Sequence, residues 1–180
     1  MDLIYYYLPA LETVRDFVEM GGNVLFIIGL LTLFMWALII ERLVYIRGGH
    51  KKIVAAALNI WETRSDHSSW NAHQVRNRLI SVVASHMERN IPMIQTCVAL
   101  CPLLGLLGTV TGMVEVFEVM AISGSGNPRS MASGVSKATI PTMAGMVAAL
   151  SGVAMATYLQ RKAGRERELL ADNLFIASDK

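Results

Sequence analysis

A single lysine stands in a stretch of the sequence that is otherwise apolar or built from small residues. Lys137 is the fourth residue of GVSKATIPTMAGMVAALSG, which covers residues 134–152. A charge inside the hydrocarbon of a membrane is costly, so a lysine there needs a partner and a purpose. Two acids, Glu115 and Glu118, stand in the preceding apolar run. We therefore predict an internal ion pair that neutralises both charges, a charged lining of an ion path, or both.

Hydroxyl residues form a second level in the same two apolar runs. Counted outward from the turn that joins the runs, Lys137 falls level with Glu115, and Thr109 falls level with Thr142. The two levels are six residues apart on the earlier run, which is about 9 Å along a helix. We expect Lys137 to pair with Glu115, with Glu118 as the alternative. The alternative to an interior-lining role for each threonine is a hydroxyl that bonds back to its own helix.

Three apolar runs must position these residues. The chain has 180 residues, of which 53% are hydrophobic and only 17% are charged, whereas soluble domains carry about 25% charged residues. The runs cover residues 24–40, 96–122 and 131–159, and about 20 apolar residues cross a bilayer. We predict an all-α integral membrane protein with three transmembrane helices and long cytoplasmic helical extensions. The net charge of +2 is too small to indicate nucleic-acid binding.

Basic residues indicate how the chain is oriented. Eight lysines and arginines lie in 41–95 and five in 160–180, whereas 1–23 and the turn at 123–130 hold one each. The positive-inside rule places the first two segments in the cytoplasm and the N-terminus and turn in the periplasm. Because no basic segment precedes the first apolar run, we expect no secretory signal peptide.

The polar segments also carry helical patterns. Residues 11–20 indicate a short amphipathic helix on the outer interface or, alternatively, a first turn that extends the membrane helix. Within 41–95, patterns at 53–61 and 75–87 predict two cytoplasmic helices, with a break at 65–71. The second pattern places these apolar residues on one face: Val75, Leu79, Val82 and Val83.

The sequence offers no catalytic machinery. No nucleotide-binding, nucleophile or metalloprotease motif appears. Cys97 and Cys101 are four residues apart, a spacing that suits neither a disulfide nor a metal site, and we interpret them as small hydrophobic residues. We therefore expect no catalytic residue, no cofactor and no metal, and the protein does not look like an enzyme.

The three apolar runs differ in composition. The first is nearly all leucine, isoleucine and phenylalanine, as expected of a helix that meets lipid. The second and third hold many small and hydroxyl residues, which let helices approach closely. We therefore expect these two helices to face protein or a lumen. Close packing is predicted at Gly105, Gly108, Gly112, Gly145 and Gly152.

Two stretches, CPLLGLLGTVTGM at 101–113 and GVSKATIPTMAGMVAAL at 134–150, resemble the ExbB/TolQ/MotA proton-channel family and are most similar to its ExbB subgroup. The resemblance covers most of the chain. It implies a homo-oligomer, by family pattern a pentamer, whose second and third spans ring a pore in the bacterial inner membrane. An ExbD-like single-span partner would place a protonatable aspartate in that pore. The complex would use the proton motive force to drive a TonB-like protein in nutrient uptake across the outer membrane.

The resemblance also implies roles for single residues. The family's pore-lining threonines correspond to Thr109 and Thr142, whose hydroxyls both donate and accept hydrogen bonds and so relay protons or hold a carboxylate through water. Where this chain has Lys137, members of the family commonly carry a glutamate. That glutamate is therefore not essential here, and we expect Lys137 to balance an acid, Glu115 by our count, and not to carry the proton.

Two other interpretations stay open. A TolQ-like subunit would serve the Tol-Pal envelope system instead of nutrient uptake. A passive membrane scaffold would only assemble other subunits, and proton flux in reconstituted vesicles separates it from a channel. A MotA-like stator fits less well, because MotA proteins have a fourth span and a larger cytoplasmic domain.

Overall fold

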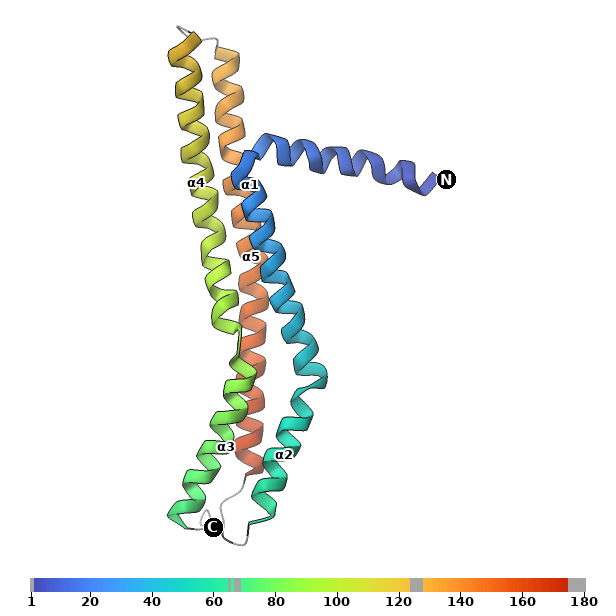
Figure 1. The fold of residues 1–180 in the computed structure, drawn as a ribbon, viewed down its shortest axis with the longest axis vertical. Coiled ribbons are helices and arrows are strands. Elements are labelled where there is room, and N and C mark those ends of the chain that lie inside the picture. Colours follow the sequence, from blue (N-terminus) through green and yellow to red (C-terminus); the bar gives the residue numbers. More distant parts are fainter. Residues whose placement is uncertain (1, 65, 67–68, 124–127, 175–180) are drawn as a thin grey trace. The chain divides into compact units, whose positions relative to one another are not determined.

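The protein is built from helices. The computed structural model describes residues 2–64, 66, 69–123 and 128–174, and these residues contain no strand. The all-α prediction is therefore confirmed. Figure 1 shows the helices in chain order, which are α1 (Asp2–Gly48), α2 (His50–Glu62), α3 (Trp70–Glu88), α4 (Ile91–Ser123) and α5 (Pro128–Asn173).

Three helical segments are long and apolar enough to cross a membrane, as the sequence predicts. They lie within Gly21–Gly48, Trp70–Ile122 and Gly134–Asn173. The helix α5 has 46 residues, and at about 1.5 Å per residue it is far longer than a hydrocarbon core of about 30 Å. A helix of this length extends well beyond the membrane at one or both ends.

A kink divides α1 into two helical parts. Gly22 has φ 64° and ψ −164°, a backbone conformation that glycine adopts readily and other residues rarely do. The kink stands two residues before Val24, where the first apolar run begins. The predicted helix at 11–20 lies inside the part of α1 that precedes the kink, and Phe17 on it is exposed.

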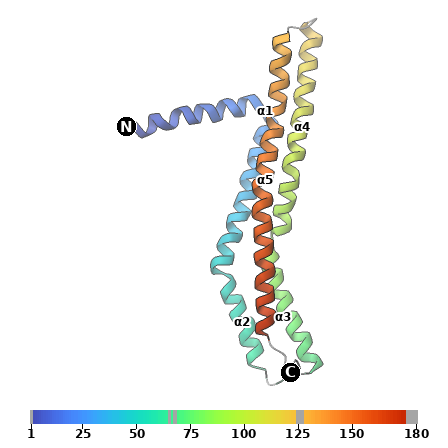
Figure 2. The ribbon, with the colours of Figure 1, turned by 180° about the vertical axis from the view of Figure 1, so that it is seen from behind.

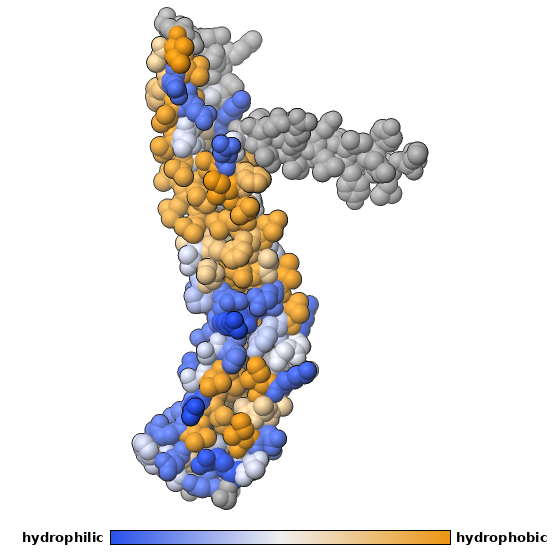
Figure 3. Space-filling view, in the orientation of Figure 1, coloured by the Kyte–Doolittle hydropathy of each residue, from blue (hydrophilic) through white to orange (hydrophobic). Residues whose placement is uncertain are grey.

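The first of two compact units comprises residues 1–35 and 96–152. In it, α4 and α5 run antiparallel and side by side, which both views show (Figures 1 and 2). Large apolar side chains are exposed on this unit and cover much of the face that Figure 3 shows. They include Leu30 and Leu33 on α1, Leu103 and Val110 on α4, and Val147 and Leu150 on α5.

Close approaches between α4 and α5 set their register. A Cβ atom on Gly105 would stand 2.9 Å from the Cα atom of Thr142, and one on Gly112 would stand 2.9 Å from the Cα atom of Ala138. Thr142 therefore lies level with Gly105, about 6 Å or one turn from the level of Thr109. By the same register Lys137 lies about 3 Å from the level of Glu115.

This register corrects the levels expected from the sequence. Counting residues outward from the turn assumes that both helices leave the turn at the same level. In the structure, two close contacts between α4 and α5 set their register. A Cβ atom on Gly108 would stand 2.5 Å from the Cβ atom of Pro141. A Cβ atom on Gly145 would stand 2.5 Å from the carbonyl oxygen of Cys101. Thr109 and Thr142 consequently do not share one level within the chain.

The second unit comprises residues 36–95 and 153–180. Its core joins α2, α3 and the last part of α5, with the buried residues Ala57, Trp61, Ala72, Ile80, Val83, Leu170 and Leu174. Val82, one of the four residues expected on one face of this helix, is 46% exposed, so only part of that face is buried. Neighbouring residues stand about 100° apart around a helix, and the buried face centres on Ile80 and Val83.

Side chains hold the helix ends of the second unit. Arg76 donates from Nε to the carbonyl of Leu174 at 2.7 Å and from Nη2 to that of Ala171 at 2.7 Å. These carbonyls stand at the C-terminal end of α5, in its last turn and just after it, where helix carbonyls lack partners and a cation is favourable. The last turn of α5 is thereby fixed to α3.

The connection between α3 and α4 is held in the same manner. Asn90 stands there with φ 68°. The buried Arg42 guanidinium donates from both Nε and Nη2 to the carbonyl of Arg89. Glu41 accepts a hydrogen bond from the Asn90 side-chain amide at 2.9 Å. Adjacent residues of α1 thus bind the two residues that separate α3 from α4.

Candidate functional site

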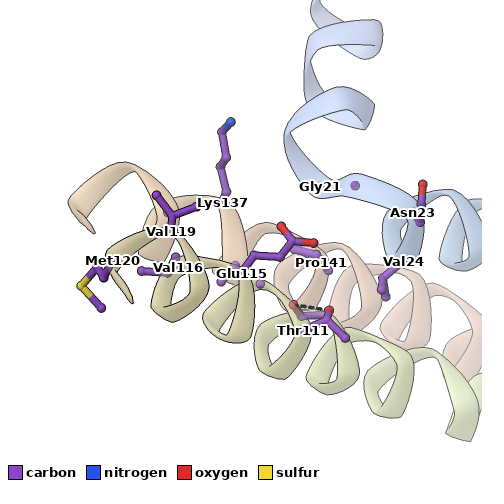
Figure 4. Close-up of a pocket in the computed structure, with 15 residues that line it drawn as sticks. Gly21, Asn23, Val24, Thr111, Glu115, Val116, Val119, Met120, Lys137 and Pro141 are labelled. Carbon is purple, nitrogen blue, oxygen red and sulfur yellow. Dashed lines mark hydrogen bonds between the residues drawn. The ribbon is translucent and has the colours of Figure 1, made fainter. Parts of the chain in front are cut away.

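A pocket of about 480 Å³ lies between the kink of α1 and the α4–α5 hairpin. Figure 4 shows its walls: α1 contributes residues at the kink, α4 contributes Thr111 and Glu115, and α5 contributes Lys137 and Pro141. Its volume is in the range of pockets that hold small ligands. Two of the three charged residues singled out in the sequence, Glu115 and Lys137, therefore line one pocket, to which α1 also contributes.

Glu115 and Lys137 share this pocket without pairing. Both side chains are exposed. In Figure 4 the Lys137 side chain extends away from the Glu115 carboxylate. Within the described part of the chain, no ion pair or hydrogen bond joins the two. The ion pair expected from the sequence stays a prediction. Glu118 does not line the pocket.

The two threonines use their hydroxyls differently. Thr142 donates across the hairpin to the carbonyl of Gly105 at 2.8 Å. Thr109 donates to the carbonyl of Leu106 in its own helix at 2.7 Å, which is the alternative considered for it from the sequence. Each hydroxyl oxygen keeps lone pairs that can accept a further hydrogen bond. Both side chains are partly exposed.

The charged level and Thr109 belong to different faces of α4. Thr111 and Glu115, four residues apart, line the pocket on the side of α1. Thr109 lies two residues from Thr111 and therefore about 160° around the helix from it. Within one chain, Glu115 and Thr109 accordingly do not lie along one continuous path.

Each of the five glycines predicted to pack closely meets another residue where its Cβ atom would stand. For Gly105, Gly112 and Gly145 the obstacle includes backbone atoms of the facing helix. For Gly152 the obstacles are the side chains of Val98 and Met35. Both α1 and α4 therefore contact α5 at this glycine. At these glycines the two helices of the hairpin pack closely.

The contribution of α1 to the pocket was not predicted from the sequence. The residues of α1 that line it are Gly21, Gly22, Asn23 and Val24. The sequence signal for them is the GGN before the first apolar run.

Cys97 and Cys101 are buried free thiols. In the parts of the chain that the structure describes, no group of three or more His, Cys, Asp or Glu side chains could hold a metal ion.

Comparison with known proteins gives a consistent family. A model of the MotA/TolQ/ExbB proton channel family matches residues 46–171. The biopolymer transport protein exbB1 of Vibrio cholerae is 43% identical over 74 residues, which cover 41% of this chain and 32% of that protein. The biopolymer transport protein ExbB of Salmonella typhimurium is 30% identical over 95 residues, which cover 53% of this chain and 39% of that protein. The chain spans less than two fifths of the length of the curated relatives it matches.

Proposed function

Because the chain belongs to the MotA/TolQ/ExbB proton channel family, we propose that it is a subunit of an inner-membrane proton channel. This channel uses the proton motive force to energise TonB-dependent nutrient uptake across the outer membrane. The observation that carries the proposal is the family match over residues 46–171, which includes all of α4 and most of α5. The similarity to proteins named for biopolymer transport supports its energy-transducing role.

The assembly that we propose has several chains. Copies of this chain form a homo-oligomer, by family pattern a pentamer, in which α4 and α5 surround the pore. An ExbD-like single-span subunit lies within the pore and a TonB-like protein receives the energy. Large apolar residues on α4 and α5, such as Leu103 and Met143, are exposed on the single chain. Such surfaces support burial against lipid or a neighbouring chain.

The proposed orientation has the N-terminus in the periplasm and the C-terminus in the cytoplasm. The concentration of basic residues in 41–95 and 160–180 supports it. The turn at 123–130 would then face the periplasm, although residues 124–127 lie outside those the structure describes.

The proton path that we propose involves Thr109 and Thr142. The protonatable carboxylate of the single-span partner moves past these residues. Each hydroxyl uses its hydrogen for a helix carbonyl, Leu106 or Gly105, so its oxygen is oriented to accept a hydrogen bond from water or from the protonated acid. Since they stand about one turn apart within the chain, they form two successive acceptor rings in a homo-oligomer instead of one.

Proton flux in proteoliposomes tests this function. The full-length chain is reconstituted with its single-span partner, and flux is measured with a pH-sensitive dye under an imposed potential. We expect flux only with the partner present, and a clear decrease in the Thr109→Val/Thr142→Val variant. Thr139→Val is the matched control, because the Thr139 hydroxyl also donates to its own helix, at Ser136. A complex that assembles but carries no protons would identify a passive scaffold.

A further inference from the structure

The pocket beside the α1 kink lies at a membrane boundary. The apolar run of α1 begins at Val24 and ends before Glu41. About 20 residues cross the hydrocarbon core, and that count from Thr96 along α4 ends at Glu115. The same count back from Leu159 along α5 ends at Ile140, about one turn of the helix from Lys137. The start of the apolar run of α1 and the two residue counts thus all indicate a headgroup level for the pocket.

The pocket is suited to an amphiphilic, doubly charged ligand. One acid and one base line it, and both are exposed and unpaired with each other in the described structure. Apolar residues form much of the remaining wall, among them Val24, Val116 and Val119. A charge at a membrane boundary finds its counter-charges in water or in lipid headgroups. A ligand that matches both charges is a zwitterion, with a cation for Glu115 and an anion for Lys137 a few bonds apart.

We propose that this pocket binds the headgroup of a zwitterionic phospholipid with a primary ammonium, of the phosphatidylethanolamine type. The lipid phosphate lies at Lys137 and the ammonium donates hydrogen bonds to Glu115, while an acyl chain follows the apolar wall. A primary ammonium has three N–H donors for a carboxylate, as a lysine head does. A choline head has none, and a purely anionic head would leave Glu115 beside another negative charge. The outer leaflet follows from the proposed orientation, but the lipid chemistry does not depend on it.

This lipid would connect the kink to the hairpin. Gly21 and Asn23 of α1 form the rim opposite Lys137, so a headgroup that fills the pocket contacts all three membrane helices. Lys137 and Glu115 would then neutralise each other through the lipid and not by direct contact. This explains how two exposed opposite charges stand on one pocket without an ion pair.

Lipid retention tests the proposal. The full-length chain in its native assembly is purified in detergent and delipidated. It is then titrated separately with dioleoyl phosphatidylethanolamine, phosphatidylcholine or phosphatidylglycerol, and bound lipids are counted by native mass spectrometry. We expect the ethanolamine lipid to bind about tenfold more tightly than the choline lipid, since its hydrogen bonds reach a charged acceptor. Equal retention of the three lipids by the wild type, or preference for the glycerol lipid, would overturn the proposal without any variant.

Variants locate the site. Glu115→Gln should abolish the preference for ethanolamine over choline, and Lys137→Gln should weaken retention of all three lipids. Glu118→Gln is the matched control, because Glu118 is an exposed acid of α4 that does not line the pocket, and it should retain the wild-type preference. No retained lipid at all would mean that a neighbouring chain covers the pocket, and the proposal would fail. Lipid retention is measured without proton flux, so it succeeds or fails independently of the proposed channel function.

Discussion

The two threonines of the proposed proton path donate their hydroxyl hydrogen bonds to carbonyls of different helices. Thr142 bonds to the neighbouring helix at Gly105, whereas Thr109 bonds within α4. Interhelical hydrogen bonds in membranes contribute about 0.6 kcal/mol on average, up to about 1.7 kcal/mol. We expect Thr142→Val to lower the stability of the assembly by about 1 kcal/mol and Thr109→Val to leave it nearly unchanged. Denaturant unfolding in detergent measures both, and equal losses would contradict the assignment.

The charged residues of the pocket make a second prediction at the scale of single residues. Lys137→Ala and Glu115→Ala each leave one charge uncompensated, whereas the double variant removes both. We expect the double variant to be milder than the sum of the singles, which a double-mutant cycle on assembly records as a coupling energy. An isolated charge costs about 2.5–3.5 kcal/mol at the membrane centre on insertion scales, and less at the boundary.

Varying the lipid composition of the membrane distinguishes two explanations of the coupling between Glu115 and Lys137. If the ethanolamine headgroup bridges the two residues, the coupling appears in vesicles that contain phosphatidylethanolamine and vanishes in pure phosphatidylcholine. If the ion pair expected from the sequence forms directly in the assembly, the coupling persists in both. Strictly additive effects in both membranes would exclude any pairing of Glu115 with Lys137.

At the scale of helices, α4 and α5 depend on backbone contact. A Cβ atom on Gly145 would stand 2.5 Å from the carbonyl oxygen of Cys101, whereas one on Gly164 of the same helix would have nothing within 4 Å. We expect Gly145→Ala to force the helices apart and to disrupt assembly. Gly164→Ala, the matched control, should be neutral or stabilising by up to about 1 kcal/mol, since alanine favours helix. Size-exclusion chromatography and thermal unfolding read out both, and normal oligomers from Gly145→Ala would refute the close contact.

The connection between α3 and α4 depends on Arg42. Its buried guanidinium donates twice to the carbonyl of Arg89 and stacks over the Tyr45 ring with its Cζ atom 5.0 Å from the ring centroid. Arg42→Gln removes this fork and leaves the carbonyl underbonded, so we expect a loss of about 1–3 kcal/mol. Lysine should not rescue it, because its ammonium lacks the planar fork.

Amide hydrogen exchange measures the loss of stability at the connection between α3 and α4. Amides of residues 89–94 should exchange faster in Arg42→Gln than in the wild type, while those in the middle of α2 should not change. Arg47→Gln is the control, since Arg47 is exposed near the end of the same helix. Unchanged exchange at 89–94 would show that Asn90 holds its conformation without Arg42.

At the scale of the whole molecule, the proposed topology makes opposite predictions for two positions. A cysteine at Ser125, in the turn outside the described residues, should react with an impermeant maleimide added to intact spheroplasts. One at Asn71, at the start of α3, should react only after lysis. Cys97 and Cys101 are buried, and replacing both with alanine removes background. Labelling of Asn71→Cys in intact spheroplasts would invert the orientation.

The sequence by itself determined the helical class, the three apolar spans and the glycines at which helices meet. Hydropathy and small-residue composition are properties of single segments, so they can be read before any partner is known. The helices predicted around 53–61 and 75–87 follow from local periodicity in the same way. The break predicted at 65–71 is shorter at its end, because α3 already begins at Trp70, and its residues 65, 67 and 68 lie outside the described residues. Lys137 and Glu115 were singled out because a charge in an apolar run is conspicuous in any one segment.

Only the tertiary structure decided how these segments meet. The register of α4 against α5 depends on where Pro141 and Gly145 find room in the facing helix, and a count from the turn misplaced Thr142 by about one turn. The face of α3 that is buried depends on α2 and α5, which is why Val82 is exposed. The pocket at Lys137 exists because α1 bends at Gly22 beside the hairpin. Each of these depends on atoms from two or three helices distant in sequence, and no single segment contains that information.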